Sequence, residues 1–368
     1  MKRILKLAFL LPVFLIGEIL NHAGFLLDEI LFPSYRRIPV KDPVFIAGMP
    51  RSGTTFLHHL LAHDQEHFTT MKLWEILSAP SITQKYIFRW ICRMDMRMNK
   101  RFSRVLLRID RRLFRDYAGV HPMSLLDVEE DDYLFFHVFS SVHLLFWFPS
   151  MKHLYKNLHF DQAYPSGKRR RKLRYYTACI RKHLYVFGRG RIYLSKSPMH
   201  TPRLGSLAQF FPDARFIYLV RYPHDVISSN MSLFEMFSRV FATPVRMEQL
   251  RERVLNMADH LYENALEKSA ILGHAMVPLR FDHLTRHTVR EIRKLYTRLG
   301  VPFRENYVSI LEREMHADKY RSTHHHSLEK YGLDMEELLI RYKTIYDEYF
   351  PGTGPETEPL QVPLVADR

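Results

Sequence analysis

Length, composition and charge set the first limits on what this chain is. Its 368 residues are 46% hydrophobic and 25% charged, the composition of a globular protein with material for a sizeable core. The net charge of +15 predicts an acidic partner: a nucleotide, a nucleic acid, an anionic glycan or an anionic membrane. The only two cysteines, Cys92 and Cys179, exclude a disulfide framework and a cysteine-based zinc site and fit a reducing compartment.

Residues 1–40 form an N-terminal segment that is first basic and then apolar. Lys2, Arg3 and Lys6 precede an apolar run over residues 7–17, which Pro12 interrupts. This run is shorter than the roughly 20 residues that a bilayer span needs. No small-x-small cleavage site follows it, and apolar residues continue to Leu31. Three interpretations stay open: an interfacial amphipathic segment or lid over an apolar pocket, an ordinary packed helix, and a true signal or anchor.

Residues 43–61 predict a buried strand, a glycine-containing turn and a helix. Gly48 and Gly53 have the G-x-x-x-x-G spacing of a loop that cradles phosphate with its backbone N–H groups. Thr54 and Thr55 follow, where a nucleoside triphosphatase carries lysine and then serine or threonine. The only cation inside the loop is Arg51. The loop therefore predicts phosphate binding and argues against ATP hydrolysis.

A long helical insertion is expected over about residues 73–185. Within it, arginines and apolar residues each recur every three or four positions between residues 87 and 115, which predicts an amphipathic basic helix or a pair of such helices. One interpretation is a solvated face on a helix that packs against the core. The other is contact with anionic lipid headgroups or with an acidic substrate.

Four strand-like runs lie at residues 44–47, 192–195, 216–220 and 277–279, each followed by a turn and a helical pattern. This alternation predicts a parallel sheet covered on both faces, which binds its ligand at the carboxyl ends of the strands. Arg221 stands at such an end, and Ser228 and Ser229 follow in the next helix. A guanidinium and a hydroxyl in this arrangement can converge on one phosphate.

Two motifs carry a resemblance to a known family. Residues 50–55, Pro-Arg-Ser-Gly-Thr-Thr, resemble the 5′-phosphosulfate loop of sulfotransferases that use 3′-phosphoadenosine 5′-phosphosulfate (PAPS). Residues 211–229 match the family's F-P-x-A-x-F-I-x-x-x-R-x-P-x-D-x-x-x-S pattern element by element. The branch that contains bacterial, tyrosylprotein and Golgi enzymes looks most similar. The resemblance implies a three-layer α/β fold like that of P-loop NTPases, with a central parallel sheet and a large helical insertion.

The resemblance also implies roles for particular residues. The 5′-phosphosulfate would be held by the loop residues Arg51, Ser52, Gly53, Thr54 and Thr55. Arg221 and Ser229 would hold the 3′-phosphate, and Lys196, aided by Arg51, would neutralise charge on the transferring group. Glu75 matches the family's catalytic base in position. The competing bases are His121 and the acidic run Glu129, Glu130, Asp131 and Asp132.

Two later segments depart from the family pattern or match it weakly. Phe281-Asp-His-Leu stands where the family usually has Tyr-Glu-x-Leu, so a phenol contact to the nucleotide is lost. Lys319 and Ser322 are expected in a late loop over PAPS. The three histidines at 324–326 do not favour a metal site, because sequence neighbours rarely converge on one ion. No metal is expected, since the cations take the place of magnesium.

The sequence therefore predicts a sulfotransferase that moves the sulfuryl group of PAPS to a hydroxyl acceptor and releases PAP (3′-phosphoadenosine 5′-phosphate). A lipid or sterol-like alcohol is the first expectation for the acceptor, because the insertion is rich in aromatic and aliphatic residues. Carbohydrate and peptide tyrosine are the alternatives, and a non-catalytic, membrane-associated anion-binding protein is the rival of another class. Residues 41–350 are expected to form the catalytic domain and residues 351–368 a flexible tail. The expected location is cytoplasmic, with peripheral attachment to a membrane surface as an alternative; a nucleic-acid partner is not expected.

Overall fold

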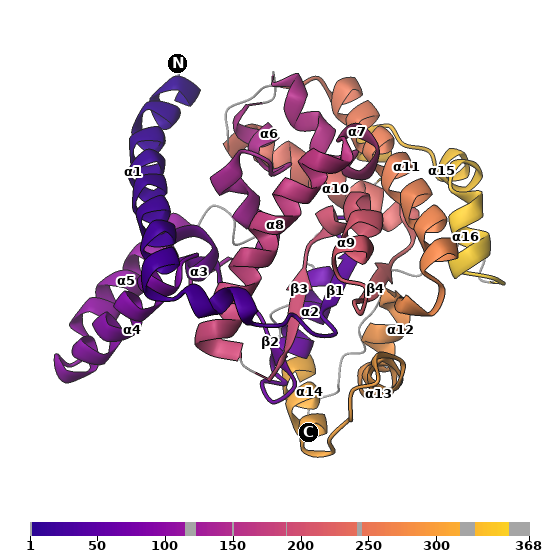
Figure 1. Ribbon diagram of the computed structural model, residues 1–368. Helices are drawn as coiled ribbons and strands as arrows, with labels where there is room; N and C mark the ends of the chain where they lie inside the picture. The colour runs from indigo at the N-terminus through magenta and orange to yellow at the C-terminus, as the bar shows by residue number, and fades with distance from the viewer. Residues whose placement is uncertain are drawn as a thin grey trace, which may run out of the picture.

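A five-stranded, all-parallel sheet forms the centre of the molecule (Figure 1). The computed structural model describes residues 2–114, 123–148, 151–188, 190–240, 245–316 and 328–352. The strand order is β2-β3-β1-β4-β5. The strands are β1 (Val44–Gly48), β2 (Phe68–Thr69), β3 (Ile192–Lys196), β4 (Arg215–Val220) and β5 (Met276–Arg280). All four predicted strands are confirmed, whereas β2, with two residues, is too short to leave a periodic pattern.

Both faces of the sheet are covered, as the unbroken apolar runs of its strands require. On one face, Ile46 and Ile217 pack against α2 (Thr54–Ala62), α12 (Phe281–Arg286), α13 (Thr288–Leu299) and α14 (Asn306–His316). On the other, Phe45 and Phe216 pack against α8 (Ser166–His183), α9 (Leu204–Phe210), α10 (Pro223–Val240) and α11 (Met247–Leu272). The same side of the sheet is extended by α15 (Met335–Arg341) and α16 (Lys343–Tyr349). The predicted three-layer α/β architecture is confirmed.

The insertion between β1 and β3 is helical, as predicted. It contains α3 (Leu73–Ser78), α4 (Ile82–Arg97), α5 (Arg101–Leu113), α6 (Leu144–Trp147) and α7 (Phe160–Ala163). Two 3-10 segments, Asp131–Val138 and Lys152–Asn157, lie between them. The basic stretch forms a pair of helices, α4 and α5, that reverse direction at Asn99 and Lys100, both with positive φ. This helical hairpin projects from one side of the molecule beside the N-terminal helix (Figure 1).

The N-terminal segment differs from the expectation in one respect. Helix α1 (Lys2–Leu31) runs through Pro12 without a break, so the helical segment is longer than the apolar run over residues 7–17. Pro12 is exposed, and at such a position the helix loses one backbone hydrogen bond and continues. In the described part of the chain, Leu11–Leu31 is the one helix long and apolar enough to cross a membrane by length and composition.

Candidate active site

The predicted phosphate loop lies where β1 ends and α2 begins. Thr201 fixes its start, because its hydroxyl donates to the carbonyl of Gly48 at 3.0 Å and accepts the N–H of Gly48 at 3.2 Å. The Asn230 amide donates to the carbonyl of Pro50 at 2.8 Å. Gly53 has φ of +95°, and a Cβ there would lie 2.3 Å from the ring of Phe281. The loop is therefore held from α10 and from the segment after β3, and it needs glycine at position 53.

The two halves of the predicted nucleotide site meet at this loop. The Arg51 Nε donates to the Ser229 hydroxyl at 3.0 Å, which joins the loop to helix α10. Burial and the nearby Arg221 guanidinium both lower the pKa of Arg51. The two guanidinium groups repel each other, and an anion bound beside them would relieve this repulsion. The structure thus brings Arg51, Arg221 and Ser229 together from distant parts of the sequence.

Further features of the loop fit a phosphate-bearing nucleotide. The Ser52 hydroxyl is buried and has no hydrogen-bond partner in the described part of the chain. Thr54 and Thr55 begin α2, whose first N–H groups have no partner within the helix and carry its positive dipole end. Orphaned donors at a helix N-terminus beside two arginines suit the phosphate groups of PAPS.

Arg221 extends the site along the carboxyl ends of the strands. Its Nε lies 3.2 Å from the Asp225 carboxylate, and its guanidinium lies 5.2 Å from the centre of the Phe281 ring. Phe281 follows β5 directly, so the phenylalanine that replaces the family's tyrosine packs on both Gly53 and Arg221. Ser228 donates to the backbone carbonyl of Asp225 at 3.1 Å, which leaves Ser229 as the serine of the pair that contacts the loop.

Lys196 lies at the carboxyl end of β3 and is fully buried. Its ammonium contacts the Thr55 hydroxyl at 3.2 Å, Glu130 at 3.1 Å and Glu129 at 3.3 Å. Burial alone would lower the pKa of Lys196, but the two carboxylates outweigh it and raise the pKa. Lys196 therefore stays charged next to the phosphate loop, in contact with two members of the acidic run.

Glu130 lies next to a further set of charged groups. Two of them, His143 and Arg203, were not predicted from the sequence. The imidazole of His143 lies 3.8 Å from Glu130 and 3.3 Å from Asp132, and Asp132 pairs with the fully buried Arg203. Burial opposes the charge on His143, yet the hydrogen bond to Asp132 and the carboxylate of Glu130 raise its pKa. No spacing in the sequence signals His143 or Arg203, because tertiary packing alone places them beside the acidic run.

Glu75 lies in a different set of contacts. Its carboxylate accepts the backbone N–H of Lys72 at 3.1 Å, and its other oxygen lies 2.9 Å from His183 and 3.7 Å from Lys85. Burial would raise the pKa of Glu75, but His183 and Lys85 lower it. The carboxylate is 3% exposed. Its role as base stays a prediction, and His121, Lys319, Ser322 and the histidines at 324–326 lie outside the described residues.

Comparison with known sequences gives a family and named relatives. A family model described as "Sulfotransferase family" matches residues 43–305. The omega-hydroxy-beta-dihydromenaquinone-9 sulfotransferase Stf3 of Mycobacterium bovis is 26% identical over 321 residues, which are 84% of this chain and 76% of the relative. The protein of the same name from Mycobacterium tuberculosis matches with the same values.

Comparison with solved structures supports the fold. Sulfotransferase STF9 from Mycobacterium avium superposes with a TM-score of 0.71 at 17% identity, over 90% of this chain and 81% of its own. Sulfotransferase STF1 from Mycobacterium tuberculosis superposes with a TM-score of 0.64 at 18% identity, over 89% of this chain and 83% of its own.

Proposed function

Because the chain belongs to the sulfotransferase family, we propose that it transfers the sulfuryl group of PAPS to the hydroxyl group of a lipid alcohol. The observation that carries this proposal is the convergence of Arg51, Arg221 and Ser229 beside the N-terminus of α2. In the proposal, residues 51–55 bind the 5′-phosphosulfate, and Arg221 and Ser229 bind the 3′-phosphate. Lys319 and Ser322 are proposed to complete the nucleotide site.

The transfer forms one bond and breaks one bond at sulfur. The acceptor oxygen attacks the sulfur in line, the bond between sulfur and the phosphate oxygen breaks, and PAP leaves with the electron pair of that bond. Negative charge therefore grows on the leaving phosphate and on the sulfuryl oxygens. Lys196, which contacts Thr55 of the loop, and Arg51 stabilise this charge as fixed cations. The proposal assigns no step to a metal ion.

The acceptor hydroxyl must lose its proton to a base. Glu130 is our first candidate, because it contacts Lys196 and lies near His143. The Lys196 ammonium at 3.1 Å and the His143 imidazole at 3.8 Å hold this carboxylate in place. Glu75 is the second candidate on the strength of its motif position, and His121 is the third. Glu130→Gln and Glu75→Gln separate the first two: the true base loses turnover by roughly 100-fold or more while PAP affinity is kept.

The relative that shares 26% identity is named for a menaquinone-derived alcohol, which supports a long lipid alcohol as the acceptor here. Aromatic side chains next to the candidate base suit such a molecule. Tyr133 stacks on Phe136 with ring centres 5.3 Å apart and lies 4.7 Å from the ring of His143. Because acceptors of this kind reside in bilayers, we place the enzyme at the cytoplasmic surface of a membrane, as a peripheral protein.

Ligand binding and turnover test the proposal separately. PAP is expected to raise the melting temperature of the full-length protein, whereas ATP with magnesium is not. Labelled PAPS is then offered with four acceptor classes in detergent: an ω-hydroxylated isoprenoid quinone, a sterol, a glycolipid and a phenol. Transfer to the isoprenoid or sterol alcohol is the expected result. Absence of stabilisation by PAP overturns the donor, and binding without turnover of any acceptor supports the non-catalytic alternative.

A further inference from the structure

Over residues 11–31, helix α1 directs its acidic and amide side chains toward the body of the protein. Asn21 is 1% exposed and Asp28 is fully buried. The Asp28 carboxylate accepts the backbone N–H groups of Ile82 and Thr83, each at 2.8 Å, and pairs with the Lys182 ammonium at 2.7 Å. These hydrogen bonds fix the orientation of the helix about its own axis.

The opposite side of α1 is apolar and uncovered. Over residues 11–31, every exposed residue except His22 is apolar. Ten large apolar side chains are between 43 and 69% exposed: Leu11, Val13, Leu15, Ile16, Ile19, Leu20, Leu26, Leu27, Ile30 and Leu31. They line a stretch of the helix about 30 Å long, whereas a soluble monomer exposes apolar patches of a few hundred Å². A surface helix in water has the reverse arrangement, so this face fits an apolar surrounding.

The hairpin of α4 and α5 combines exposed apolar residues with a single sign of charge. Trp90, Phe102, Val105 and Ile109 are 46 to 59% exposed. All nine exposed charged residues between positions 82 and 112 are cations: Arg89, Arg93, Arg97, Lys100, Arg101, Arg104, Arg108, Arg111 and Arg112. The two aspartates of this stretch are buried and bind local N–H groups. The hairpin therefore presents apolar side chains flanked by positive charge.

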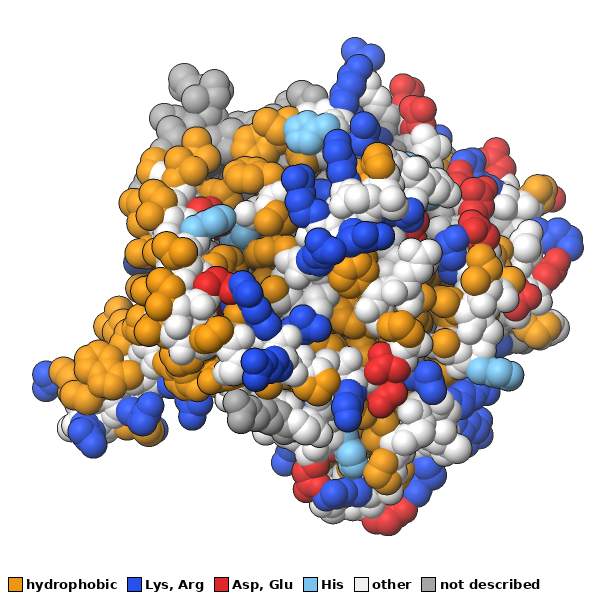
Figure 2. Space-filling model, viewed as in Figure 1, with side chains coloured by type: hydrophobic (Ala, Val, Ile, Leu, Met, Phe, Trp, Pro, Cys, Tyr) orange, Lys and Arg blue, Asp and Glu red, His pale blue; other side chains and the backbone are white. Residues whose placement is uncertain are grey.

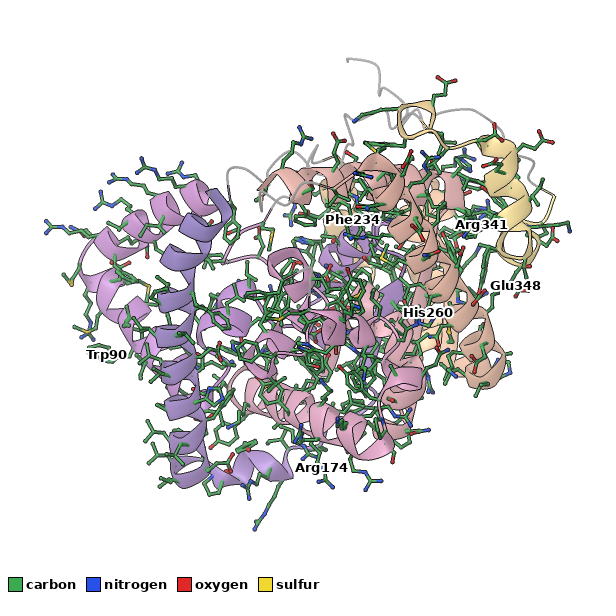
Figure 3. The ribbon with its side chains drawn as sticks, turned by 90° about the horizontal axis from the view of Figure 1, so that it is seen from above. Trp90, Arg174, Phe234, His260, Arg341 and Glu348 are labelled. Carbon is green, nitrogen blue, oxygen red and sulfur yellow. The ribbon has the colours of Figure 1, made fainter. Side chains whose placement is uncertain are left out.

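The two surfaces are continuous. The Gln84 amide donates to the Asn21 side chain at 2.7 Å, and the rings of Phe32 and Tyr86 lie 5.5 Å apart. Figure 2 shows hydrophobic side chains along α1 and onto the hairpin, with lysine and arginine around the hairpin's edge. In Figure 3, Trp90 lies on the hairpin at the side of the molecule opposite to Arg341 of α15. Apolar and cationic groups thus share one side of the protein.

We propose that α1 and the hairpin together form a docking surface for a bilayer that contains anionic phospholipids. The outer face of α1 lies among the acyl chains, while the arginines of α4 and α5 contact the phosphate groups of the lipids. The helix lies within one leaflet, because its polar face stays bound to the catalytic body through Asp28 and Asn21. Charge selects the partner: nine cations without an exposed acid favour an anionic surface over a neutral one.

The surface also connects to the candidate site. Phe14 of α1 lies 6.1 Å from Phe139, ring centre to ring centre. Phe139 directly follows the 3-10 segment that carries Tyr133 and Phe136, the aromatic pair beside His143. A lipid alcohol that leaves the bilayer along α1 would reach the base over aromatic side chains. This route for the acceptor rests on the proposed function, whereas docking to the bilayer does not.

Vesicle flotation with the full-length protein tests the docking surface. Vesicles of phosphatidylcholine with 30% phosphatidylglycerol, a composition chosen for the experiment, are expected to bind the protein at least tenfold more tightly than pure phosphatidylcholine vesicles. Ile16→Glu with Ile30→Glu, and separately Arg104→Glu with Arg108→Glu, are each expected to reduce binding at least tenfold. Brominated lipids are expected to quench tryptophan fluorescence, and Trp90→Phe to remove most of that quenching.

Matched variants separate docking from general effects of charge and from the donor site. Ile340→Glu changes an isoleucine that is 72% exposed on α15, at the other side of the molecule. Arg253→Glu with Arg298→Glu repeats the charge change on α11 and α13. These controls are expected to keep vesicle binding, and every variant is expected to keep PAP binding.

Two results would overturn the proposal. One is a protein that stays in solution with both kinds of vesicle while it still binds PAP. The other is a protein that is a dimer by light scattering and becomes a monomer with Ile16→Glu and Ile30→Glu, because a second copy of the chain would then cover α1. If the wild-type protein floats with anionic vesicles but does not bind PAP, the result contradicts the proposed function and leaves the docking surface intact.

Discussion

At the scale of single residues, the site depends on positive charges held close together. Arg51 donates a hydrogen bond to Ser229. Its burial, and secondly the nearby Arg221 guanidinium, lower the pKa of Arg51. Such repulsion costs stability unless an anion binds. We therefore expect this cluster to bind an anionic ligand, as the proposed function requires.

Replacing Arg221 is expected to weaken the binding of PAP. A charge-assisted hydrogen bond is worth about 1.5–3 kcal/mol, so Arg221→Ala should reduce the affinity roughly 10- to 100-fold in a calorimetric titration. Arg221→Lys should restore only part of it, because lysine lacks the planar fork of donors. Arg298→Ala, on an exposed position of α13, is the control. Unchanged affinity in Arg221→Ala would remove Arg221 from the nucleotide site.

His143 is expected to make stability depend on pH. Its pKa is raised in the folded protein, so its contribution is fully present below the unfolded value of about 6.5 and is lost as the pH rises through the folded value. The free energy of unfolding should therefore differ more between wild type and His143→Gln at pH 6 than at pH 9. Denaturant titrations at both pH values measure this, and a difference that grows with pH would contradict the assignment.

At the scale of elements, buried ion pairs fasten the helical insertion to the sheet. Asp132, in the 3-10 segment Asp131–Val138, pairs with Arg203 of the 3-10 segment Pro198–Arg203 that follows β3. The Arg203 guanidinium also lies 4.4 Å from the ring centre of Phe135. Since Glu130 and His143 lie next to this pair, the fastening also positions the candidate base.

Removing the charge of Asp132 is expected to destabilise the fold by about 3–5 kcal/mol at pH 7, because Arg203 would remain buried without its partner. Burial would raise the pKa of Asp132, but Arg203 lowers it well below its usual range. Its contribution is thus present above the unfolded value near 3.9 and is lost as the pH falls through the folded value. The effect of Asp132→Asn should therefore shrink below pH 4.

The control for this measurement is Asp347→Asn. Asp347 forms an exposed pair with Lys343 at 2.6 Å, and such surface pairs contribute between about 0 and 1 kcal/mol. Equal destabilisation by the two substitutions in urea titrations would show that Asp132 does not fasten the insertion.

At the scale of the whole molecule, the charge of +15 serves two regions. One is the donor site, and the other is the docking surface of α1, α4 and α5. Figure 1 places α1 and the hairpin to one side of the sheet, so in our proposal the bilayer contacts that side of the molecule.

The association of PAP is expected to slow as salt is added. A positive field attracts an anionic nucleotide, and ions screen that field beyond about 10 Å at 0.1 M and about 3 Å at 1 M. Stopped-flow measurements between low and high salt should show the association rate fall by roughly tenfold. Adenosine, which carries no phosphate, should associate at a rate that salt hardly changes, and equal salt dependence of both ligands would contradict a role for the protein's field.

The sequence by itself determined the family, the parallel sheet and the glycine-containing loop between β1 and α2. These features depend on local patterns: apolar runs for strands, glycine at positions 48 and 53, and an arginine with a serine eight residues later. The tertiary structure decided which carboxylates contact Lys196, because Glu129 and Glu130 reach it only when the insertion folds back on β3. It also decided that the apolar side of α1 faces outward. A sequence pattern shows that a helix has two faces, whereas buried partners such as Lys182 determine which face turns to the protein.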